Sequence, residues 1–560
     1  MTCQDMRTAP RSRSRSDVLD GIGLILLAAT VRLALLPLAG QDTNDHSLRL
    51  WIAQRLSEDP FLMLHGHWPP LHFYLLAPVI GLTGDLFVAP ILLQVVLSAA
   101  VPPLLYAFAR REFHSRPAAL AVGAAYALYP ISIRTTLEAL AQAPFSLCVA
   151  ATLLALSHAR GERAGWRPVL LAGLASVLSS LLRVEGWLLL PLFAATLLPR
   201  LGRAVAFAAI AAIGPFVLMA ANTLHYGDPL FPLTTVVEFE LGLAGREQFT
   251  AVQYAGQVVR FLVLLLGGMT PLLALACGLG GLACLLQRSR AAVWLIPAAG
   301  LSLILLASVA RGSTAPKAIY TDTLGLLWIP FLAGLLTAPL LSRLGRRAPA
   351  VVGGLVLTAM LMQLLVGTAR DVPGLRSSVP LLAALPIPGA APTFAGRERL
   401  DSLVPLLRTR AADGGAGLVI DALGTPGSYY LGWQSRFHPD RIFLASGAPN
   451  ADPLAVPPPA RRALRERAQP LRDSEPLALD RFLRRYCSGF LILQPGSRFA
   501  AALDLQPPDR AALGGVALDL ERRAAVPWPL PADPRLRAPG AAADAGDAVV
   551  FAYHATPCEP

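Results

Sequence analysis

The segment from residue 41 to residue 70 concentrates titratable side chains between two long apolar stretches. Asp42 and Asp45 lie three residues apart in it, so a helix that begins at Asp42 would carry both carboxylates on one face. Either carboxylate can act as a general base, which removes the proton from an attacking hydroxyl group. The structural alternative is that Asp42 caps the helix and Asp45 takes the capping-box position.

Apolar residues recur along the same expected helix. Its apolar side consists of Leu48, Trp51, Ile52 and Leu56. We expect this side to rest on the membrane, which would hold the carboxylates at the level of a lipid headgroup.

The histidines of this segment offer a second chemistry. His65 and His67 are two residues apart, a spacing that can serve a metal if the chain is extended. A zinc site needs three or four ligands, so Asp45 or His46 would have to complete it. The alternative is a pair of solvated histidines at the membrane surface, so a divalent metal is a hypothesis only.

Two further stretches place a cation beside an anion at the boundary of an apolar run. Arg134 precedes Glu138 by four residues, and Arg183 precedes Glu185 by two. Charged groups at membrane depth are costly unless they are paired or functional, and arginine can bind a phosphate through two parallel hydrogen bonds. The spacing therefore predicts either a phosphate-binding site or two internal ion pairs.

Lys317 and Tyr320 add a cation and a hydroxyl group just before another apolar run. Lys317 is the only lysine of the chain. In a chain whose other basic residues are all arginine, this indicates a specific role, and we include both residues in the candidate substrate site.

The composition indicates which elements must position these side chains. Of the 560 residues, 54% are hydrophobic and 15% are charged, whereas soluble proteins have about 25% charged residues. The mean hydropathy of +0.53 also indicates a membrane protein. The net charge of +12 comes from arginine in a chain rich in alanine, glycine and proline. We attribute it to compositional bias and expect no nucleic acid as a partner.

Apolar runs long enough for a bilayer, about 17 to 25 residues each, predict an all-α bundle of about eleven transmembrane helices, some of them short. The expected spans are Gly21–Leu38, Leu86–Ala109, Pro117–Tyr129, Ala139–Leu156, Val169–Leu182, Trp187–Leu198, Ala204–Ala221, Val258–Leu286, Ala291–Val309, Leu324–Leu341 and Ala350–Val366. Alternate loops are rich in arginine, which predicts that residues 1–20 and those loops are cytoplasmic. The acidic loops between them should then face outward.

The composition changes after residue 370. Residues 371–400 read as a linker, and residues 401–560 as an extracytoplasmic α/β or α+β domain, with strands at 417–423 and 490–493 and helices at 461–467 and 480–485. The turn at residues 424–427 and Tyr429 and Tyr430 could touch substrate, but a plain turn is the preferred interpretation. Cys487 and Cys558 are the only cysteines of this domain, and they are either a disulfide or two separate thiols.

Several of these segments together carry a resemblance to a known family. The carboxylates after the first span, Pro69-Pro70 followed by Tyr74, residues 129–138, Arg183-Val-Glu185-Gly186, and residues 226–230 stand in the order found in the GT-C superfamily of membrane glycosyltransferases. The chain is most similar there to bacterial protein O-mannosyltransferases and to aminoarabinose transferases of lipid A, over about residues 20–345. One departure is that the family's Asp-Glu pair is Asp45-His46 here.

The resemblance implies an inverting transfer of a sugar from a polyprenyl-phosphate carrier to an acceptor on the outer side of the bacterial cytoplasmic membrane. Asp45 or Asp42 would be the base, and the cations named above would bind the donor phosphate, with His46 and Tyr74 nearby. Membrane lipids are expected as partners, and the acceptor could be a lipid, a glycan or a protein. The alternatives are a sugar-lipid transporter or flippase, a polymerase or ligase of surface polysaccharides, and a non-catalytic assembly subunit.

Overall fold

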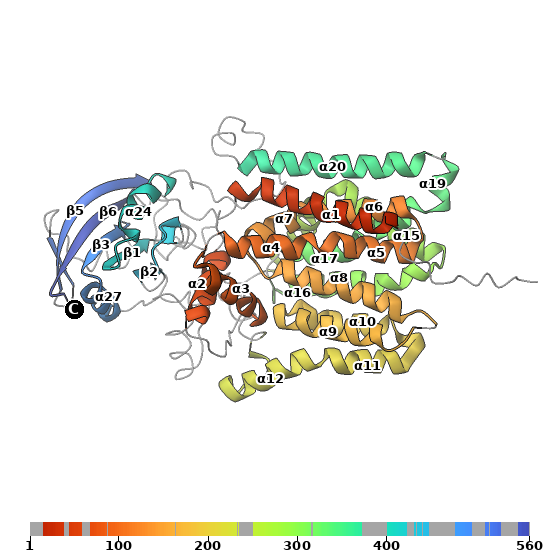
Figure 1. Cartoon of the computed structure of the whole chain (residues 1–560), viewed down its shortest axis with the longest axis horizontal. Coiled ribbons are helices and arrows are strands. Elements are labelled where there is room, and N and C mark those ends of the chain that lie inside the picture. The colour runs from red at the N-terminus through yellow and green to blue at the C-terminus, as the bar shows by residue number, and fades with distance from the viewer. Residues whose placement is uncertain are drawn as a thin grey trace, which may run out of the picture.

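The structure is a computed structural model of the whole chain. It describes residues 15–38, 44–58, 68–86, 88–162, 164–231, 233, 250–314, 317, 319–345, 347–371, 400–422, 431–432, 434–438, 441–446, 476–494, 510–513, 516–527 and 547–558. A helical bundle and a smaller domain built around a β-sheet lie end to end (Figure 1).

Many helices of the bundle lie in the expected apolar runs, but the run expected at Val258–Leu286 is divided into two helices and the one at Leu324–Leu341 into three. They are α1 (Arg15–Ala34), α2 (Asn44–Glu58), α3 (Leu71–Thr83), α4 (Ala89–Ala99), α5 (Val101–Phe113), α6 (Arg116–Ala127), α7 (Pro130–Leu137), α8 (Gln142–Ala159), α9 (Arg167–Leu182), α10 (Glu185–Ala195), α11 (Leu201–Ala211), α12 (Ile213–Tyr226), α14 (Ala251–Met269), α15 (Pro271–Leu286), α16 (Leu295–Ala310), α17 (Tyr320–Trp328), α18 (Phe331–Leu336), α19 (Pro339–Arg343) and α20 (Ala348–Asp371). Short 3-10 helices occupy Leu36–Leu38, Leu198–Arg200 and Arg290–Trp294.

Among the described residues, six helical stretches are long and apolar enough to cross a membrane. They are Ala89–Phe113, Gln142–Ala159, Leu198–Leu224, Val252–Met269, Arg290–Ala310 and Ala348–Ala369. Shorter apolar helices such as α9 and α10 lie among them, so the expected count of about eleven crossings stays a prediction.

Local sequence sets the ends of several helices. The Ser115 side chain accepts a hydrogen bond from Ala118 N and begins α6, and Thr250 forms a capping box with Gln253 at the start of α14. At the other end, α12 stops at Gly227, whose φ of 72° suits a residue without a side chain.

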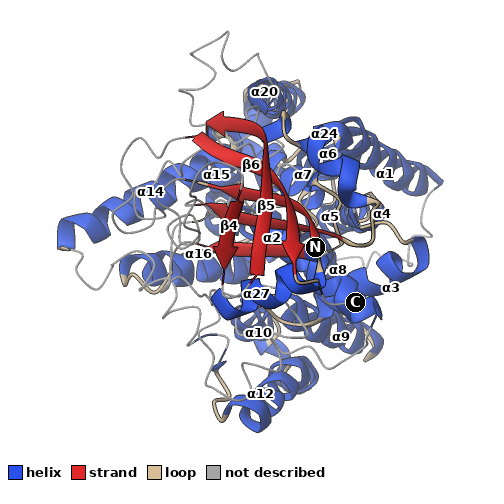
Figure 2. Cartoon of the chain, turned by 90° about the vertical axis from the view of Figure 1, so that its left-hand side faces the viewer, coloured by secondary structure: helices blue, strands red, loops and turns tan. Residues whose placement is uncertain are grey.

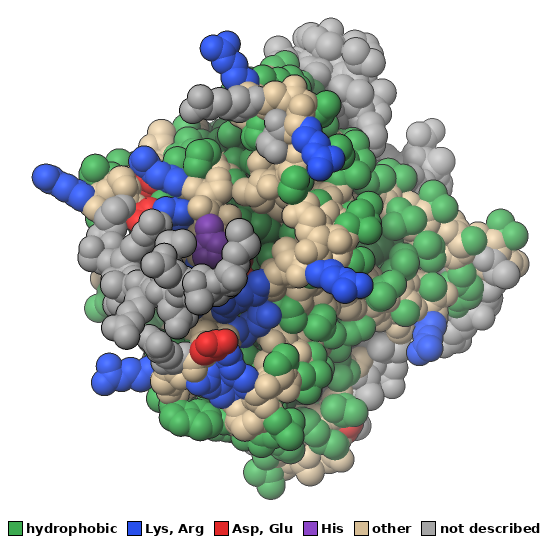
Figure 3. Space-filling model, turned by 90° about the vertical axis from the view of Figure 1, so that its right-hand side faces the viewer, with side chains coloured by type: hydrophobic (Ala, Val, Ile, Leu, Met, Phe, Trp, Pro, Cys, Tyr) green, Lys and Arg blue, Asp and Glu red, His purple; other side chains and the backbone are tan. Residues whose placement is uncertain are grey.

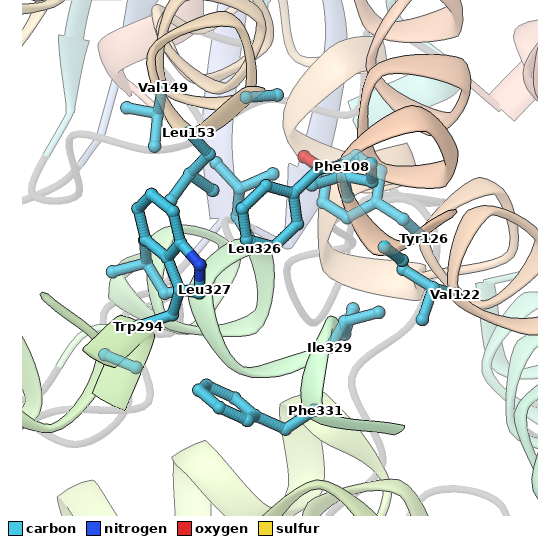
Figure 4. Close-up of a cluster of buried hydrophobic side chains, with 14 of the residues drawn as sticks. Phe108, Val122, Tyr126, Val149, Leu153, Trp294, Leu326, Leu327, Ile329 and Phe331 are labelled. Carbon is cyan, nitrogen blue, oxygen red and sulfur yellow. The ribbon is translucent and has the colours of Figure 1, made fainter. Parts of the chain in front are cut away.

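The core of the bundle is a continuous cluster of buried apolar side chains (Figure 4). Phe108 of α5 meets Trp294 edge to face, with ring centroids 5.0 Å apart. Tyr126 of α6 and Leu326 of α17 lie in the same cluster. Helices from distant parts of the chain are therefore held in one packed body.

The second domain contains α24 (Val404–Ala411), α27 (Pro476–Arg485) and a six-stranded mixed sheet. Its strands are β1 (Ala416–Ala422), β2 (Ile442–Ser446), β3 (Ser488–Leu493), β4 (Arg510–Leu513), β5 (Val516–Pro527) and β6 (Asp547–Thr556). They lie in the order β2-β1-β3-β6-β5-β4, in which β1 is parallel to β2 and β3, and the other neighbours are antiparallel. Figure 2 shows this sheet across the end of the bundle.

The mixed sheet confirms that strands form in the C-terminal region, and β1, β3 and α27 match three of the four elements expected there. The expected helix at 461–467 and the segment 424–430 lie outside the described residues. Cys487 and Cys558 form a disulfide, with their Cα atoms 5.5 Å apart, so the open alternative is resolved in favour of the bridge.

The sheet has two buried faces because its residues alternate along each strand. Leu418, Ile420 and Phe490 point to a cluster that also contains α2 and α3, whereas Val419 and Leu491 point to a cluster with α27. One face of the sheet domain is therefore packed on the first loop helix of the bundle.

The contact with the sheet domain corrects one expectation about α2. Trp51, Ile52 and Leu56 are almost fully buried inside the protein and do not rest on the membrane. The ring of Trp51 lies so close to Gly432 that a Cβ atom there would be 3.1 Å from Trp51 Cη2. The apolar side of the helix was recognised correctly, but it packs on α3, α7 and the C-terminal domain.

Candidate active site

Helix α2 places Asp45 in its first turn, because the helix begins at Asn44. The side chains of Asp45 and His46, and Asp42 as a whole, lie outside the described residues. Asp45 and Arg49 are four residues apart in this helix, so they are neighbours on one face.

Arg49 is a cation of this region that the sequence did not single out. It is only 4% exposed, its guanidinium carbon lies 4.2 Å from the ring centroid of Trp68, and Nη1 lies 3.5 Å from His72 Nδ1. The other ring nitrogen of His72 lies 3.1 Å from Gln94 Nε2. Stacking on an aromatic ring and polar contacts from α3 and α4 hold this cation in a fixed position.

Helix α7 connects α2 to the polar interior of the bundle. Ile133 and Leu137 are fully buried in the cluster that contains α2. On the other side of α7, Thr135 donates a 3.0 Å hydrogen bond to Asp322 of α17. A short helix that begins at Pro130 therefore has one apolar side toward α2 and one polar side toward α17.

Both ion pairs that the spacing left as the alternative to a phosphate site are present, at the ends of α7 and α9. Arg134 Nε lies 2.8 Å from Glu138 Oε1; the Glu138 side chain is 3% exposed, whereas Arg134 keeps 25% of its side-chain surface exposed. Arg183 pairs with Glu185, and its Nε lies 3.1 Å from Glu185 Oε2. Burial alone would lower the pKa of Arg183, but the Glu185 carboxylate outweighs this and leaves that pKa raised.

Asp322 is the centre of a buried polar cluster. It is 1% exposed, and it accepts hydrogen bonds from Tyr126 at 3.3 Å and from Thr135 at 3.0 Å. Tyr129 donates a 2.6 Å hydrogen bond to the carbonyl oxygen of Thr321. These contacts tie the beginning of α17 to α6 and α7.

Arg32 contacts the same polar side of α7, at Ser132, and is fully buried. Its Nε donates to Ser98 Oγ at 2.9 Å and its Nη2 to Ser132 Oγ at 3.1 Å. Its Nη1 donates to the carbonyl oxygens of Ala28 and Ala127. A buried guanidinium with four such partners fixes the last turn of α1 against α4, α6 and α7.

The remaining predicted residues lie at the same end of the bundle. Tyr320 is the first residue of α17, Lys317 comes just before it, and Tyr320 is within electrostatic range of Arg183. Tyr74 of α3 is 36% exposed. His65 and His67 lie outside the described residues, and the described part of the chain holds no group of three metal-ligating side chains.

The sequence therefore singled out Arg134, Glu138, Arg183 and Glu185, but it missed Arg32, Arg49 and Asp322. Arg32 and Asp322 had a signal, because each is an isolated charge in an apolar helix, and such charges are usually functional or paired. Arg49 had none, since an arginine in an amphipathic helix is ordinary.

The geometry defines a class of protein: a multi-pass membrane protein with a loop helix between its bundle and a sheet domain. Residues 67–223 match the family model described as dolichyl-phosphate-mannose-protein mannosyltransferase. The fold resembles ArnT from Cupriavidus metallidurans bound to undecaprenyl phosphate, with a TM-score of 0.54, 14% identity, and coverage of 98% of this chain and 100% of that chain.

The same protein in the apo state gives a TM-score of 0.53 at 15% identity, covering 97% of this chain and 98% of that chain. At these identities the likeness concerns the fold. No curated protein matches the chain significantly in sequence. The family match is confined to residues 67–223, whereas the shared fold extends along nearly the whole chain.

Proposed function

We propose that the protein transfers a sugar from a polyprenyl-phosphate carrier to an acceptor on the outer side of the cytoplasmic membrane. The observation that carries this proposal is the fold match along nearly the whole chain to a transferase whose structure holds undecaprenyl phosphate. The family model over residues 67–223 supports the same reaction class.

The outward placement is supported by the distribution of arginine. Figure 3 shows the end of the molecule opposite the sheet domain, where basic side chains gather. Arg110, Arg116, Arg200 and Arg290 lie at the helix ends on that side, next to the short connections. Basic residues in short loops stay cytoplasmic, so the candidate site and the sheet domain would face outward.

In the proposed step, Asp45 removes the proton of an acceptor hydroxyl group while the oxygen attacks the anomeric carbon. The new carbon–oxygen bond forms as the bond to the carrier phosphate breaks, and the phosphate leaves with the electron pair. Attack from the side opposite the leaving group inverts the anomeric centre. Asp42 is the alternative base, because both carboxylates belong to the same loop.

Cations would stabilise the charge that develops on the leaving phosphate. Arg134 keeps exposed side-chain surface, so it is suited to contact the phosphate, whereas Arg49 is one helical turn from Asp45 but almost fully buried and would act through its charge. Arg183 is almost buried with Glu185 and would act mainly through its position beside Tyr320. Lys317 completes the set of candidate phosphate ligands.

The test is transfer by the purified full chain from a synthetic undecaprenyl-phosphate sugar to a total envelope extract, followed by mass spectrometry of the products. Asp45→Asn should lower kcat about a hundredfold to ten-thousandfold, the usual contribution of a general base. Asp42→Asn should have the smaller effect.

The matched control is Asp85→Asn at the same end of the bundle. Asp85 accepts hydrogen bonds from Val88 N and Ala89 N at the start of α4, and asparagine can accept the same bonds. This control should keep full activity. Wild-type rates in both loop variants, with normal membrane abundance, would contradict the carboxylate mechanism.

A further inference from the structure

The end of the bundle opposite the candidate active site carries a compact group of arginines, which we call the arginine cluster. It comprises Arg111, Arg160, Arg200, Arg203 and Arg290, contributed by α5, the end of α8, the α10–α11 connection, the start of α11 and the 3-10 helix before α16. These residues play no part in the proposed sugar transfer.

Two arginines of the cluster hold the end of α8. Arg203 donates to the carbonyl oxygens of Ala159 at 2.6 Å, Gly161 at 2.9 Å and Ala164 at 2.5 Å. Arg200 donates to the Ala159 carbonyl oxygen at 3.3 Å. Their role is structural, since a helix C-terminus presents carbonyl groups without helical partners.

The other three arginines lie around the same turn. Arg160 Nη1 donates to the backbone oxygen of Arg290 at 3.3 Å, and its guanidinium carbon is 5.6 Å from the ring centroid of Trp294. A Cβ atom on Gly161 would lie 3.4 Å from Arg111 Nη2, so the Arg111 guanidinium lies over the chain next to Arg160.

Their positive charge is only partly neutralised by the protein. Glu112 is the only described carboxylate within 4.0 Å of any of the three, at 3.9 Å from Arg160, and its other oxygen accepts a hydrogen bond from Ser157. Arg111 Nε is buried without a hydrogen-bond partner. Arg160 has a lowered pKa because burial removes its hydration; Glu112 opposes this lowering, and Arg290 and Arg200 add to it.

The usual excess of arginine in cytoplasmic loops would explain arginine side chains that are exposed to water. It does not explain arginine side chains that are packed against one another. The Arg160 side chain is only 16% exposed, and its one acidic neighbour is 1% exposed. Partly buried like charges repel each other strongly unless a counter-charge is added. An anion at this position would relieve the repulsion.

The exposed apolar residues beside the arginine cluster indicate that the anion belongs to a lipid. Trp166, in the loop after α8, is 63% exposed, as expected for an aromatic ring at a membrane interface. Leu171 of α9 and Leu201 of α11 are 61% and 66% exposed beside the same loop. Helices α9 and α11 pack together, so an apolar surface adjoins the charged one.

We propose that the arginine cluster binds the phosphodiester headgroup of an anionic phospholipid, with the acyl chains along α9 and α11. Arg111, Arg160 and Arg290 contact the phosphate, and Arg200 and Arg203 fix the turn that presents them. The lipid bridges α5, α8 and the segment before α16 at the cytoplasmic end of the bundle. Basic sites between helices at this depth are suited to such headgroups.

The test uses the full chain purified in a neutral detergent and titrated with mixed micelles of phosphatidylglycerol or phosphatidylcholine. Native mass spectrometry measures the bound lipid, and thermal unfolding measures the resulting rise in Tm. Phosphatidylglycerol should bind and raise Tm, whereas phosphatidylcholine should do neither. Inorganic phosphate and glycerol phosphate form separate arms, and if they raise Tm as much as the lipid, the site is one for free anions and the proposal is overturned.

The variant Arg111→Gln/Arg160→Gln/Arg290→Gln should bind phosphatidylglycerol about a hundredfold more weakly, and each single variant about fivefold more weakly, as expected from the usual contribution of one basic residue. The matched control Arg15→Gln/Arg343→Gln/Arg347→Gln removes the same charge from exposed positions at the same end and should bind normally.

If the triple glutamine variant does not fold, the single variants and the lysine triple variant replace it. Lysine keeps the charge but loses the planar fork, so binding should fall between wild type and glutamine. Equal losses in the cluster and control variants, or wild-type binding in every cluster variant, would overturn the proposal.

Discussion

Through the contact between Trp51 and Gly432, the C-terminal domain helps to position α2, the helix that carries Asp45. Trp51 is fully buried and lies six residues after Asp45 in α2, which is about 9 Å along the helix axis. A Cβ atom on Gly432 would lie 3.1 Å from Trp51 Cη2 and 3.4 Å from Trp51 Cζ2. A larger side chain at Gly432 must therefore displace the ring of Trp51 or move α2.

The substitution Gly432→Val tests this arrangement. Overpacking of a buried contact costs about 1–3 kcal/mol, part of which will appear as movement of α2. A misplacement of about 1 Å at a catalytic group can lower the rate about a hundredfold. We therefore expect kcat to fall tenfold to a hundredfold with a smaller change in KM.

A compensating change distinguishes positioning from a general loss of stability. Trp51→Leu removes the ring atoms that approach Gly432, although burial of a tryptophan contributes about 4–6 kcal/mol at the usual value per unit area. The free-energy loss of the double variant Trp51→Leu/Gly432→Val should be smaller than the sum of the losses of the two single variants, by about 1 kcal/mol or more.

The assays are steady-state transfer and thermal unfolding of each purified variant. Glu58→Gln is the control at the same interface, because Glu58 and His438 lie 2.9 Å apart but are 39% and 34% exposed, and such a pair contributes little. If Gly432→Val lowers the melting temperature but leaves kcat and KM at wild-type values, the domain stabilises the protein without positioning α2.

Three further outcomes are expected. Asp322→Asn should lower the free energy of unfolding by about 1–3 kcal/mol. Asparagine has only one side-chain oxygen to accept the hydrogen bonds of Tyr126 and Thr135, and it removes the negative charge near Arg32. A variant that unfolds in detergent like the wild type would contradict this. Cys487→Ser opens a bridge with a sequence separation of 71 and should destabilise the sheet domain by up to about 4 kcal/mol, seen as a lower Tm that dithiothreitol reproduces in the wild type. Transfer should survive EDTA, because arginines can neutralise the leaving phosphate, whereas loss of activity restored by a divalent cation would support a metal at residues 65–67.

Hydropathy predicted the bundle well because each helix is specified by its own residues. The run expected at Ala139–Leu156 is α8 (Gln142–Ala159), and the one expected at Val169–Leu182 is α9 (Arg167–Leu182). The ion pairs at residues 134–138 and 183–185 were also predictable, because both partners come from one short stretch. Local composition is sufficient for features of this kind.

The environment of α2 was not predictable in the same way. An amphipathic pattern shows which side of a helix avoids water, but it does not show whether lipid or protein covers that side. Here the cover comes from residues far along the chain, as the contact between Glu58 and His438 shows with a separation of 380 residues. Only the packing of the sheet domain decides between the two.

The buried polar cluster around Arg32 and Asp322 shows the same limit of sequence reasoning at the candidate site. The pairs that the sequence revealed neutralise their own charge within a few residues, so they add little net charge to the place where a phosphate would lie. Arg32 and Asp322 instead find partners about 100 to 200 residues away, at Ser132, Tyr126 and Thr135. Contacts over such distances form only in the folded bundle, so they fix how α1, α7 and α17 lie relative to one another. The part of the site that sequence reasoning missed is therefore the part that holds the candidate ligands in place.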